Sequence, residues 1–263
     1  MKSNSHYLIT LENLLHTLID QLSQAKLSVA TDVKAKNCFL SIISHELMSP
    51  LVSISGFSEL LTTASIPQEQ KEWANHINHS SRELELMFKD ILTFMDLNTQ
   101  EVVVKNCPFL AATMISSVSH DLQQTSLNKG LQVTTLIDST LPLLLCDEKL
   151  LHHALSILAS NAVKFTQQGH IQYSARSLAT KEGWVQVEFA IEDTGIGISL
   201  EDQKNLFEIM KPLDASLTRR HRGIGLGLTL CRQLVKLLGG EFAYESNSNV
   251  GSLFRITLWL EMA

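Results

Sequence analysis

The chain has 263 residues and a formal net charge of −6 at pH 7, which argues against broad, non-specific nucleic-acid binding. Hydrophobic residues make up 44% and charged residues 18%, a composition typical of a globular protein rather than a disordered one. No apolar run approaches the roughly 18 residues of a membrane helix, and the four cysteines lack CxxC spacing, so we expect a cytoplasmic protein with reduced thiols.

The first segment carries a heptad pattern. Apolar residues recur at alternating steps of three and four from Leu8 to Val29. This spacing predicts an N-terminal coiled coil over residues 1–34. The segment from Leu8 to Ser49 holds no Gly or Pro, so we expect the helix to continue. Pro50 should kink it rather than end it, because the apolar stripe persists on both sides.

Two amphipathic helices are predicted between residues 35 and 99. The first carries a broad apolar stripe from Leu40 to Leu61, and the second has apolar residues from Trp73 to Met95 on one face. The run 62–67 separates them, which predicts an antiparallel helical hairpin. One hairpin cannot bury so wide an apolar face alone. We therefore expect two chains to pair as a homodimer with a four-helix bundle.

Beyond residue 100 the pattern changes to a mixture of strands and helices. Strand patterns occur at 102–104, 131–137, 169–177, 184–192, 242–244 and 253–260. Helical periodicity occurs at 109–126, 147–166 and 228–238, where Gly239-Gly240 provides a stop signal. This order predicts an α+β domain with one mixed sheet and helices on a single face.

The first motif with chemical character is His45-Glu46 in the predicted hairpin. His45 should project away from the apolar stripe, and an exposed imidazole on a rigid helix is a competent nucleophile. A carboxylate such as Glu46 can fix the ring tautomer and act as its base. Taken alone, the pair is more simply explained as a solvated helix surface.

The second motif is Asp193-Thr-Gly195-Ile-Gly197, directly after a strand pattern. A carboxylate at a strand end can accept a hydrogen bond from an exocyclic amine such as that of adenine. The two glycines would allow the backbone to approach a flat ring closely and to adopt positive φ. In isolation, the same pattern is equally consistent with a β-turn.

Two further motifs indicate phosphate binding. The stretch Arg219–Leu228 is rich in arginine and glycine and opens a helix, where exposed amides bind anions, although it is no Walker loop. Asn161 and Lys164 share one face of the predicted helix 147–166. An amide and an ammonium there suit a nucleotide, and Phe165 is a candidate to stack on its base.

Together and in this order, the motifs resemble those of the sensor histidine kinases of bacterial two-component systems, over about residues 35–260. His45-Glu46-Leu-x-x-Pro50 resembles the family's phosphoacceptor box. The Asn box, the first glycine box, the phenylalanine box and the second glycine box are matched by residues 161–166, 193–197, 207–216 and 225–228. The residues within these motifs are most similar to those of hybrid kinases, although this chain contains no receiver domain.

The resemblance implies a coiled-coil helix at 1–34, a dimerisation and phosphotransfer hairpin at 35–99 and a GHKL-type ATP-binding domain, an α/β sandwich, at 100–263. It implies autophosphorylation of His45 from ATP and Mg²⁺, with Glu46 as general base. The phosphoryl group would then pass to an aspartate on the receiver domain of a separate response regulator. The implied nucleotide-binding residues are Asn161, Lys164, Phe165, Asp193, Gly195, Gly197, Arg219, Arg220, Gly223, Gly225, Leu226 and Gly227.

Several positions depart from the family pattern, and two of them bear on the chemistry. Ile157 stands where the resemblance places an asparagine that ligates Mg²⁺, which leaves the metal ligands open. Ser49 stands at a position implicated in phosphatase activity and retains a hydroxyl. The alternative to a kinase is therefore a scaffold that binds nucleotide or a response regulator without catalysis. Another GHKL ATPase is disfavoured, because those lack a His box on a hairpin.

No sensor domain is evident in the sequence. About 35 residues precede the His box, and they carry the coiled-coil pattern. We therefore expect the signal to arrive through a separate sensor or regulatory protein, unless the chain is a piece of a longer one.

Overall fold

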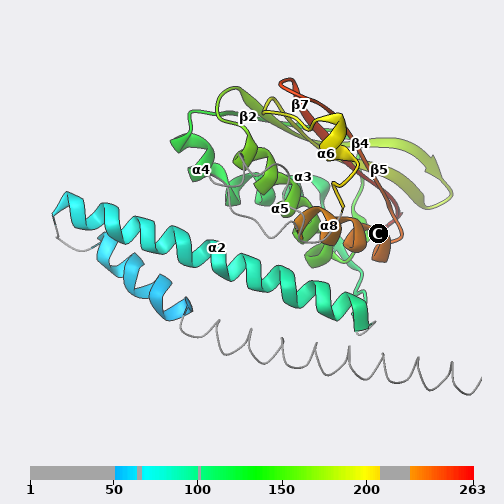
Figure 1. Ribbon diagram of the computed structural model, residues 1–263. Coiled ribbons are helices and arrows are strands. Elements are labelled where there is room, and N and C mark those ends of the chain that lie inside the picture. Colours follow the sequence, from blue (N-terminus) through cyan, green and yellow to red (C-terminus); the bar gives the residue numbers. More distant parts are fainter. Residues whose placement is uncertain (1–50, 64–66, 100–101, 208–225) are drawn as a thin grey trace, which may run out of the picture. The chain divides into compact units, whose positions relative to one another are not determined.

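The computed structural model describes residues 51–63, 67–99, 102–207 and 226–263 (Figure 1). The chain divides into two compact units, Met1–Met95 and Asp96–Ala263. The predicted coiled coil of residues 1–34 and the bend at Pro50 lie outside the described residues. Within the described ranges, no helix combines the length and apolar character needed to cross a bilayer.

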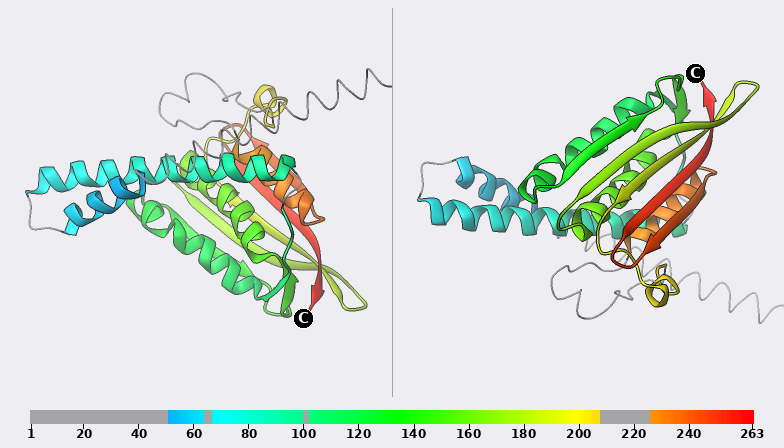
Figure 2. Two further views of the ribbon diagram at one scale, coloured as in Figure 1. Left: turned by 90° about the horizontal axis from the view of Figure 1, so that it is seen from below. Right: turned by 90° about the horizontal axis from the view of Figure 1, so that it is seen from above.

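In the first unit, a helix over residues 51–63 lies beside α2 (Gln68–Thr99) and runs in the opposite direction, as both views of Figure 2 show. The Arg82 guanidinium lies 3.7 Å from the Glu59 carboxylate, an ion pair that links the two helices. Pro67 stands before α2, and its carbonyl accepts hydrogen bonds from the amides of Gln70 and Lys71. The predicted helical hairpin is confirmed over these residues.

The second unit contains a mixed sheet. Its strands are β1 (Cys107–Phe109), β2 (Gln132–Ile137), β3 (Leu144–Cys146), β4 (His170–Lys181), β5 (Trp184–Asp193), β6 (Glu241–Asn247) and β7 (Gly251–Met262). The order is β1-β3-β7-β5-β4-β2, with β6 also paired to β7. The β2–β4 pair is parallel and the other pairs are antiparallel.

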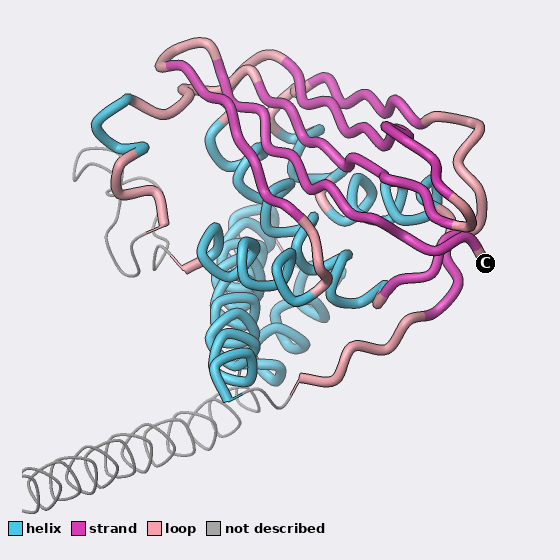
Figure 3. Tube along the Cα trace, turned by 90° about the vertical axis from the view of Figure 1, so that its right-hand side faces the viewer, coloured by secondary structure: helices cyan, strands magenta, loops and turns pink. Residues whose placement is uncertain are grey.

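Helices cover one face of this sheet, as Figure 3 shows. The helices of the unit are α3 (Ala111–Asp121), α4 (Gln123–Asn128), α5 (Glu148–Phe165), α6 (Leu200–Gln203) and α8 (Gly227–Leu237). On the other face, Glu188 of β5 forms ion pairs with Arg176 and Arg255 of neighbouring strands. The predicted α+β fold class, with helices on a single face, is confirmed.

Some local predictions were wrong. Val102–Val104 is not a strand; the strand in this region is β1, five residues later. The predicted helix 109–126 is interrupted at Leu122, which separates α3 from α4. The strand β3 and the short helix α6 were not predicted. Strands of three residues are too short for a period-2 pattern, so they are defined by pairing, of β1 with β3 and of β3 with β7.

The core between sheet and helices also positions the end of β5. Val187, Phe189 and Ile191 point toward the helices and are buried, since side chains alternate between the two faces of a strand. The same alternation places Asp193 on the helix-covered face, where it is only 6% exposed. A carboxylate therefore ends a row of apolar core residues.

Candidate functional site

The end of β5 and the end of α5 meet at Asp193. The Asp193 carboxylate accepts a hydrogen bond from the Gly195 amide at 2.8 Å. The next amide in the chain, that of Ile196, donates to the Phe165 carbonyl at 3.3 Å. The structure thus brings together two motifs, 161–166 and 193–197, that lie about thirty residues apart in the sequence.

Burial raises the pKa of the Asp193 carboxyl to about 6, and the charge of Glu192 adds to this effect. Hydrogen bonds from the backbone of Gly195 and Ser252 act in the opposite direction. A carboxylate held in such a place gains most from a further donor that enters the site, because solvation by water is limited. An exocyclic amine is such a donor.

Glycine is required at both positions of this motif because backbone atoms of other segments lie too close for a side chain. A Cβ on Gly195 would lie 2.6 Å from the Phe165 carbonyl oxygen, although its φ is not positive. Gly197 has φ +63°, as predicted, and a Cβ there would overlap the Asn247 carbonyl. The atoms that crowd these glycines belong to α5 and to the β6–β7 turn. The predicted approach of a ligand ring stays a prediction.

The β6–β7 turn holds the loop that follows Asp193. The Ile198 amide donates to the Ser246 hydroxyl at 2.8 Å, and the Asn249 amide donates to the Ile196 carbonyl at 2.6 Å. The Gln203 side-chain amide donates to the carbonyls of Ile198 and Ser246. These bonds fix the backbone from which the Asp193 carboxylate is presented.

Helix α5 carries the remaining described site residues. Asp147 caps its first turn by accepting a hydrogen bond from the Leu150 amide at 3.1 Å. Asn161 and Lys164 lie in its last two turns and are both partly exposed. The Lys164 ammonium lies 5.4 Å from the centre of the Phe165 ring. An amide, a cation and an aromatic ring therefore lie near the end of α5, whose last residue contacts the loop after Asp193.

Lys129 supports this end of α5, and sequence reasoning missed it. Its ammonium donates to the Val163 carbonyl at 2.6 Å and to the carbonyls of Lys164 and Thr166 at 3.3 Å. Partial burial lowers the pKa of Lys129. A cation at a helix C-terminus satisfies carbonyls that have no partner within the helix and interacts favourably with the dipole. No pattern around Lys129 in the sequence indicated this contact.

Replacing Lys129 with methionine is expected to lower the free energy of unfolding by about 1–3 kcal/mol, because three carbonyls lose a charged donor. Urea unfolding followed by circular dichroism measures this. Lys181→Met, at an exposed position in the β4–β5 hairpin, is the matched control and should change stability by less than about 0.5 kcal/mol. Equal effects of the two substitutions would contradict a supporting role for Lys129.

The start of α8 packs against α5. Leu226 precedes the helix and is buried, and Gly227 is its first residue. A Cβ on Gly227 would lie 3.2 Å from Cγ2 of Ile157, whose side chain is 8% exposed. Ile157 therefore forms part of the α5–α8 packing at the predicted second glycine box.

Phe207 is also tied to α8. The Thr229 hydroxyl donates to the Phe207 carbonyl at 2.9 Å, and the Arg232 guanidinium lies 4.3 Å from the centre of the Phe207 ring. Phe242 and Tyr244 contact the same ring edge-on, each with a centroid distance of 5.9 Å. The first residue of the predicted phenylalanine box is thus anchored between α8 and β6.

The other predicted site residues lie outside the described residues. These are His45, Glu46, Ser49, Arg219, Arg220, Gly223 and Gly225. In the part of the chain that is described, no three His, Cys, Asp or Glu side chains gather to hold a metal ion.

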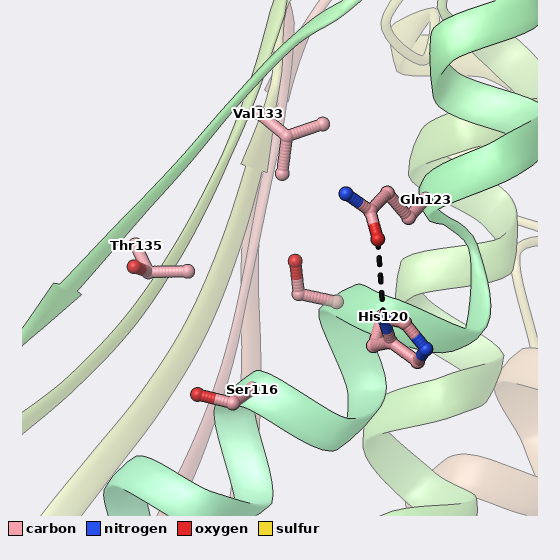
Figure 4. Close-up of a pocket in the computed structure, with 6 residues that line it drawn as sticks. Ser116, His120, Gln123, Val133 and Thr135 are labelled. Carbon is pink, nitrogen blue, oxygen red and sulfur yellow. Dashed lines mark hydrogen bonds between the residues drawn. The ribbon is translucent and has the colours of Figure 1, made fainter.

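A hollow of about 300 Å³ lies elsewhere, between α3 and the edge strand β2 (Figure 4). It is lined by Ser116, Ser119, His120, Gln123, Val133 and Thr135. Nδ1 of His120 lies 3.1 Å from the Gln123 side-chain oxygen. None of the predicted site residues lines this hollow, so it is separate from the site at Asp193.

Two family models match the chain. Residues 146–262 match the family described as histidine kinase-, DNA gyrase B- and HSP90-like ATPase. Residues 35–100 match the His Kinase A (phospho-acceptor) domain. The first match covers the Asp193 site, and the second covers the predicted hairpin.

Curated relatives align over most of this chain. The signal transduction histidine-protein kinase BarA of Escherichia coli K12 is 34% identical over 243 residues, which cover 92% of this chain and 26% of BarA. The sensory/regulatory protein RpfC of Xanthomonas campestris pv. campestris is 35% identical over 231 residues, or 87% of this chain and 31% of RpfC. The chain thus spans less than a third of the length of these relatives.

Solved structures are similar as well. Full-length ShkA, crystallised in complex with AMPPNP, aligns with a TM-score of 0.65 and 26% identity over 85% of this chain and 46% of ShkA. The Acinetobacter baumannii histidine kinase AdeS aligns with a TM-score of 0.55 over 83% of this chain and 98% of that chain. At 19% identity, AdeS supports the fold alone.

Proposed function

The chain belongs to the histidine kinases, and from this premise we propose that it transfers the γ-phosphoryl group of ATP to its own His45. The observation that carries the proposal is the buried Asp193 carboxylate beside the end of α5, within the matched ATPase domain. The match at 35–100, which includes His45, supports the acceptor. We also propose the division into 1–34, 35–99 and 100–263.

ATP recognition would begin at Asp193. Its carboxylate accepts the exocyclic amine of adenine while it keeps the hydrogen bond from Gly195, since an ionised carboxylate can accept about four hydrogen bonds. Phe165 flanks the base, and Asn161 and Lys164 face the phosphates. The residues present fit an added polar ligand: the hydroxyl of Thr166, directly after Phe165, is buried without a hydrogen-bond partner among the described residues.

The remaining proposed contacts come from the glycine-rich stretch. Arg219 and Arg220 would neutralise phosphate charge, and the amides from Gly223 to Gly227 would cradle the phosphates at the start of α8. The position of Gly227 as the first residue of α8 supports this part of the proposal.

The transfer step would be an in-line displacement at phosphorus. A ring nitrogen of His45 forms a bond to the γ-phosphorus as the bond to the β,γ-bridging oxygen breaks, and ADP leaves. Glu46 accepts the proton from the other ring nitrogen. Catalysis of this kind depends mainly on positioning and charge neutralisation. The phosphoryl group then passes to an aspartate on the receiver domain of a response regulator, and the Ser49 hydroxyl is a candidate for the reverse dephosphorylation.

Mg²⁺ bound with ATP would neutralise charge on the phosphates. The amide oxygen of Asn161 fits such an ion, whereas the side chain of Ile157 has no ligand atom and is buried against Gly227. Mg²⁺ commonly keeps several waters and few protein ligands. We therefore propose that loss of a ligand at position 157 weakens Mg²⁺ binding without abolishing activity.

The proposed assembly is a homodimer formed through the hairpin. Large apolar side chains are exposed along both of its helices in the single chain, which is costly unless a partner covers them. They are Val52, Ile54, Phe57, Leu60, Leu61, Trp73, Ile77, Leu84 and Leu86. Further proposed partners are a response regulator and a separate sensor or regulatory protein. ATP and receiver domains are cytoplasmic, so the proposal places these domains in the cytoplasm.

Incubation of the purified chain with γ-labelled ATP and Mg²⁺ tests the proposed function. We expect a label that is stable in alkali and lost in acid, as for phosphohistidine, and its absence from a His45→Ala variant. Binding of ATP without any label on the wild-type chain would instead support the scaffold alternative.

The raised pKa of Asp193 predicts a pH dependence. The ionised carboxylate accepts the adenine amine more strongly than the protonated carboxyl, so ATP affinity should rise from pH 5 to pH 7, by up to about tenfold, as Asp193 titrates around its pKa of about 6. Without ATP the sign is opposite: the folded chain holds this proton more tightly than the unfolded chain, so the contribution of Asp193 to stability falls as pH rises from 4 to 6.

Isothermal titration calorimetry from pH 5 to 7 measures the affinity. The Asp193→Asn variant is the control, because its remaining pH dependence comes from the nucleotide phosphates and other groups. Identical profiles for the two proteins would contradict the assigned role of Asp193.

A further inference from the structure

Two of the cysteines are direct neighbours across a strand pair. Cys107 of β1 stands opposite Cys146 of β3 in their antiparallel register. Both are free thiols; Cys107 is exposed, whereas Cys146 is 3% exposed. Residues directly opposite each other on antiparallel strands point to the same face of the sheet. The two thiols therefore lie side by side on the same face of the sheet, where Cys146 is covered and Cys107, on the edge strand, is open to solvent.

The proline between them fixes the kind of pair they form. Pro108 lies opposite Leu145 and has no amide hydrogen, so this pair cannot exchange two backbone hydrogen bonds. Because the two kinds of pair alternate, Cys107 and Cys146 occupy a hydrogen-bonded pair, with Cα atoms about 5.5 Å apart. That separation is within the range for disulfides, but Cβ atoms at such pairs lie about 5 Å apart, farther than the usual ~3.8 Å. A bond here would be strained, and strained disulfides are easily reduced.

The pair lies at a junction of the chain. β1 is an edge strand of three residues, so it can shift toward β3 at little cost. Just before it, the Lys105 amide donates to the Asp147 carboxylate at 2.8 Å. Asp147 follows Cys146 and caps α5, the helix that carries the candidate site. A covalent bond would fix the entry segment of the second unit to the start of that helix.

We propose that Cys107 and Cys146 form a redox-sensitive thiol pair, which hydrogen peroxide converts into a reversible disulfide. In the first step, the Cys107 sulfur attacks the peroxide, the O–O bond breaks, and a sulfenic acid and water form. In the second step, the Cys146 sulfur attacks the Cys107 sulfur, and the hydroxyl leaves as water with the Cys146 proton. The peroxide is reduced by two electrons, and the two thiols are oxidised.

The order of these steps follows from burial. Burial raises the pKa of Cys146 to about 12 and shields this thiol from dissolved peroxide, so it does not react first. It reacts only with the Cys107 sulfenic acid, which forms directly opposite it, and its proton passes to the departing hydroxyl. Cys107 is open to solvent and reacts first. The proposal does not depend on kinase activity, and its failure would leave the proposed function untouched.

Peptide mapping of the full chain tests the proposal. The reduced protein is treated with hydrogen peroxide, and free thiols are then blocked with N-ethylmaleimide. We expect a loss of two hydrogen atoms in mass, a linked peptide pair containing Cys107 and Cys146, and full reversal by dithiothreitol. A Cys38→Ser variant should behave the same, whereas Cys107→Ser and Cys146→Ser should lose the linked pair. In Cys146→Ser, dimedone should trap a sulfenic acid on Cys107.

Two results would overturn the proposal. One is oxidation of Cys107 to a sulfinic acid in the wild-type chain while Cys146 still reacts with N-ethylmaleimide. The other is a linked peptide that joins Cys107 to any other cysteine or to a second chain. Circular dichroism of each variant confirms that a lost bond does not reflect a lost fold.

Discussion

Asp193→Asn is expected to weaken ATP binding about 100-fold, because a charge-assisted hydrogen bond to a buried carboxylate contributes about 1.5–3 kcal/mol. Asparagine has the same shape but only one acceptor oxygen. In the native chain the carboxylate already accepts from the Gly195 amide at 2.8 Å. The variant must give up either that bond or the adenine amine, and its own NH₂ group faces a donor.

Glu192→Gln is the matched control for this substitution. Glu192 is the adjacent residue on β5, but strand alternation places it on the open face, where it is exposed. The Glu192→Gln substitution removes the same charge one residue away but leaves the Asp193 carboxylate in place. ATP affinity should therefore stay within about twofold of wild type. Calorimetric titration compares the two variants. Similar losses would show that overall charge, rather than the Asp193 contact, governs binding.

Gly197→Ala is expected to destabilise the second unit by about 2–5 kcal/mol and to displace the loop after Asp193. Two causes add: alanine at φ +63° costs about 1–2 kcal/mol, and its Cβ would overlap the Asn247 carbonyl. Relief of this overlap requires the loop to move off the β6–β7 turn. The hydrogen bonds of Ile196 and Ile198 to that turn would then break.

Gly130→Ala separates the two causes. Gly130 has φ +68°, nearly the value of Gly197, but a Cβ there meets no atom within 4 Å. It should therefore show only the backbone cost of about 1 kcal/mol. Thermal or urea unfolding measures both variants, and calorimetry measures ATP affinity, which only Gly197→Ala should reduce. Equal destabilisation by the two substitutions would contradict the packing role of Gly197.

Much of the fold was predictable, because its larger elements carry clear periodicity. The strand pattern ending at residue 192 predicted β5, and the spacing of Asn161 and Lys164 placed both on one helix, α5. The strands β1 and β3 were not predicted, because three residues are too few to show an alternation of apolar and polar side chains. Their existence depends on pairing partners that are distant in sequence.

The residues of the candidate site could be selected from the sequence, but the contacts that hold them in place could not. Asp193 and the glycines could be selected because they follow a strand pattern and stand in order with the other motifs, whereas the pattern alone is equally consistent with a β-turn. The contact of Lys129 with the end of α5 links residues 34 to 37 positions apart and leaves no local signal. From the sequence, Gly195 and Gly197 were expected to make room for a ligand ring. In the structure, the atoms that leave no room for a side chain there are the Phe165 and Asn247 carbonyls.

Ile157 shows how a sequence departure gains physical meaning from structure. From the sequence it was only a missing ligand atom. In the structure it packs against Gly227 at the start of α8, so the α5–α8 contact has apolar character at this position. An asparagine there would add an oxygen but would lose buried apolar surface.

We propose that ATP held at Asp193 phosphorylates His45. Tandem mass spectrometry under alkaline conditions, after incubation with ATP and Mg²⁺, locates the phosphate in wild-type and Asp193→Asn chains. We expect phosphate on His45 in the wild type and a loss of at least tenfold in the variant, at ATP concentrations below saturation. Phosphate on another residue, or equal phosphorylation of His45 in both chains, would contradict it.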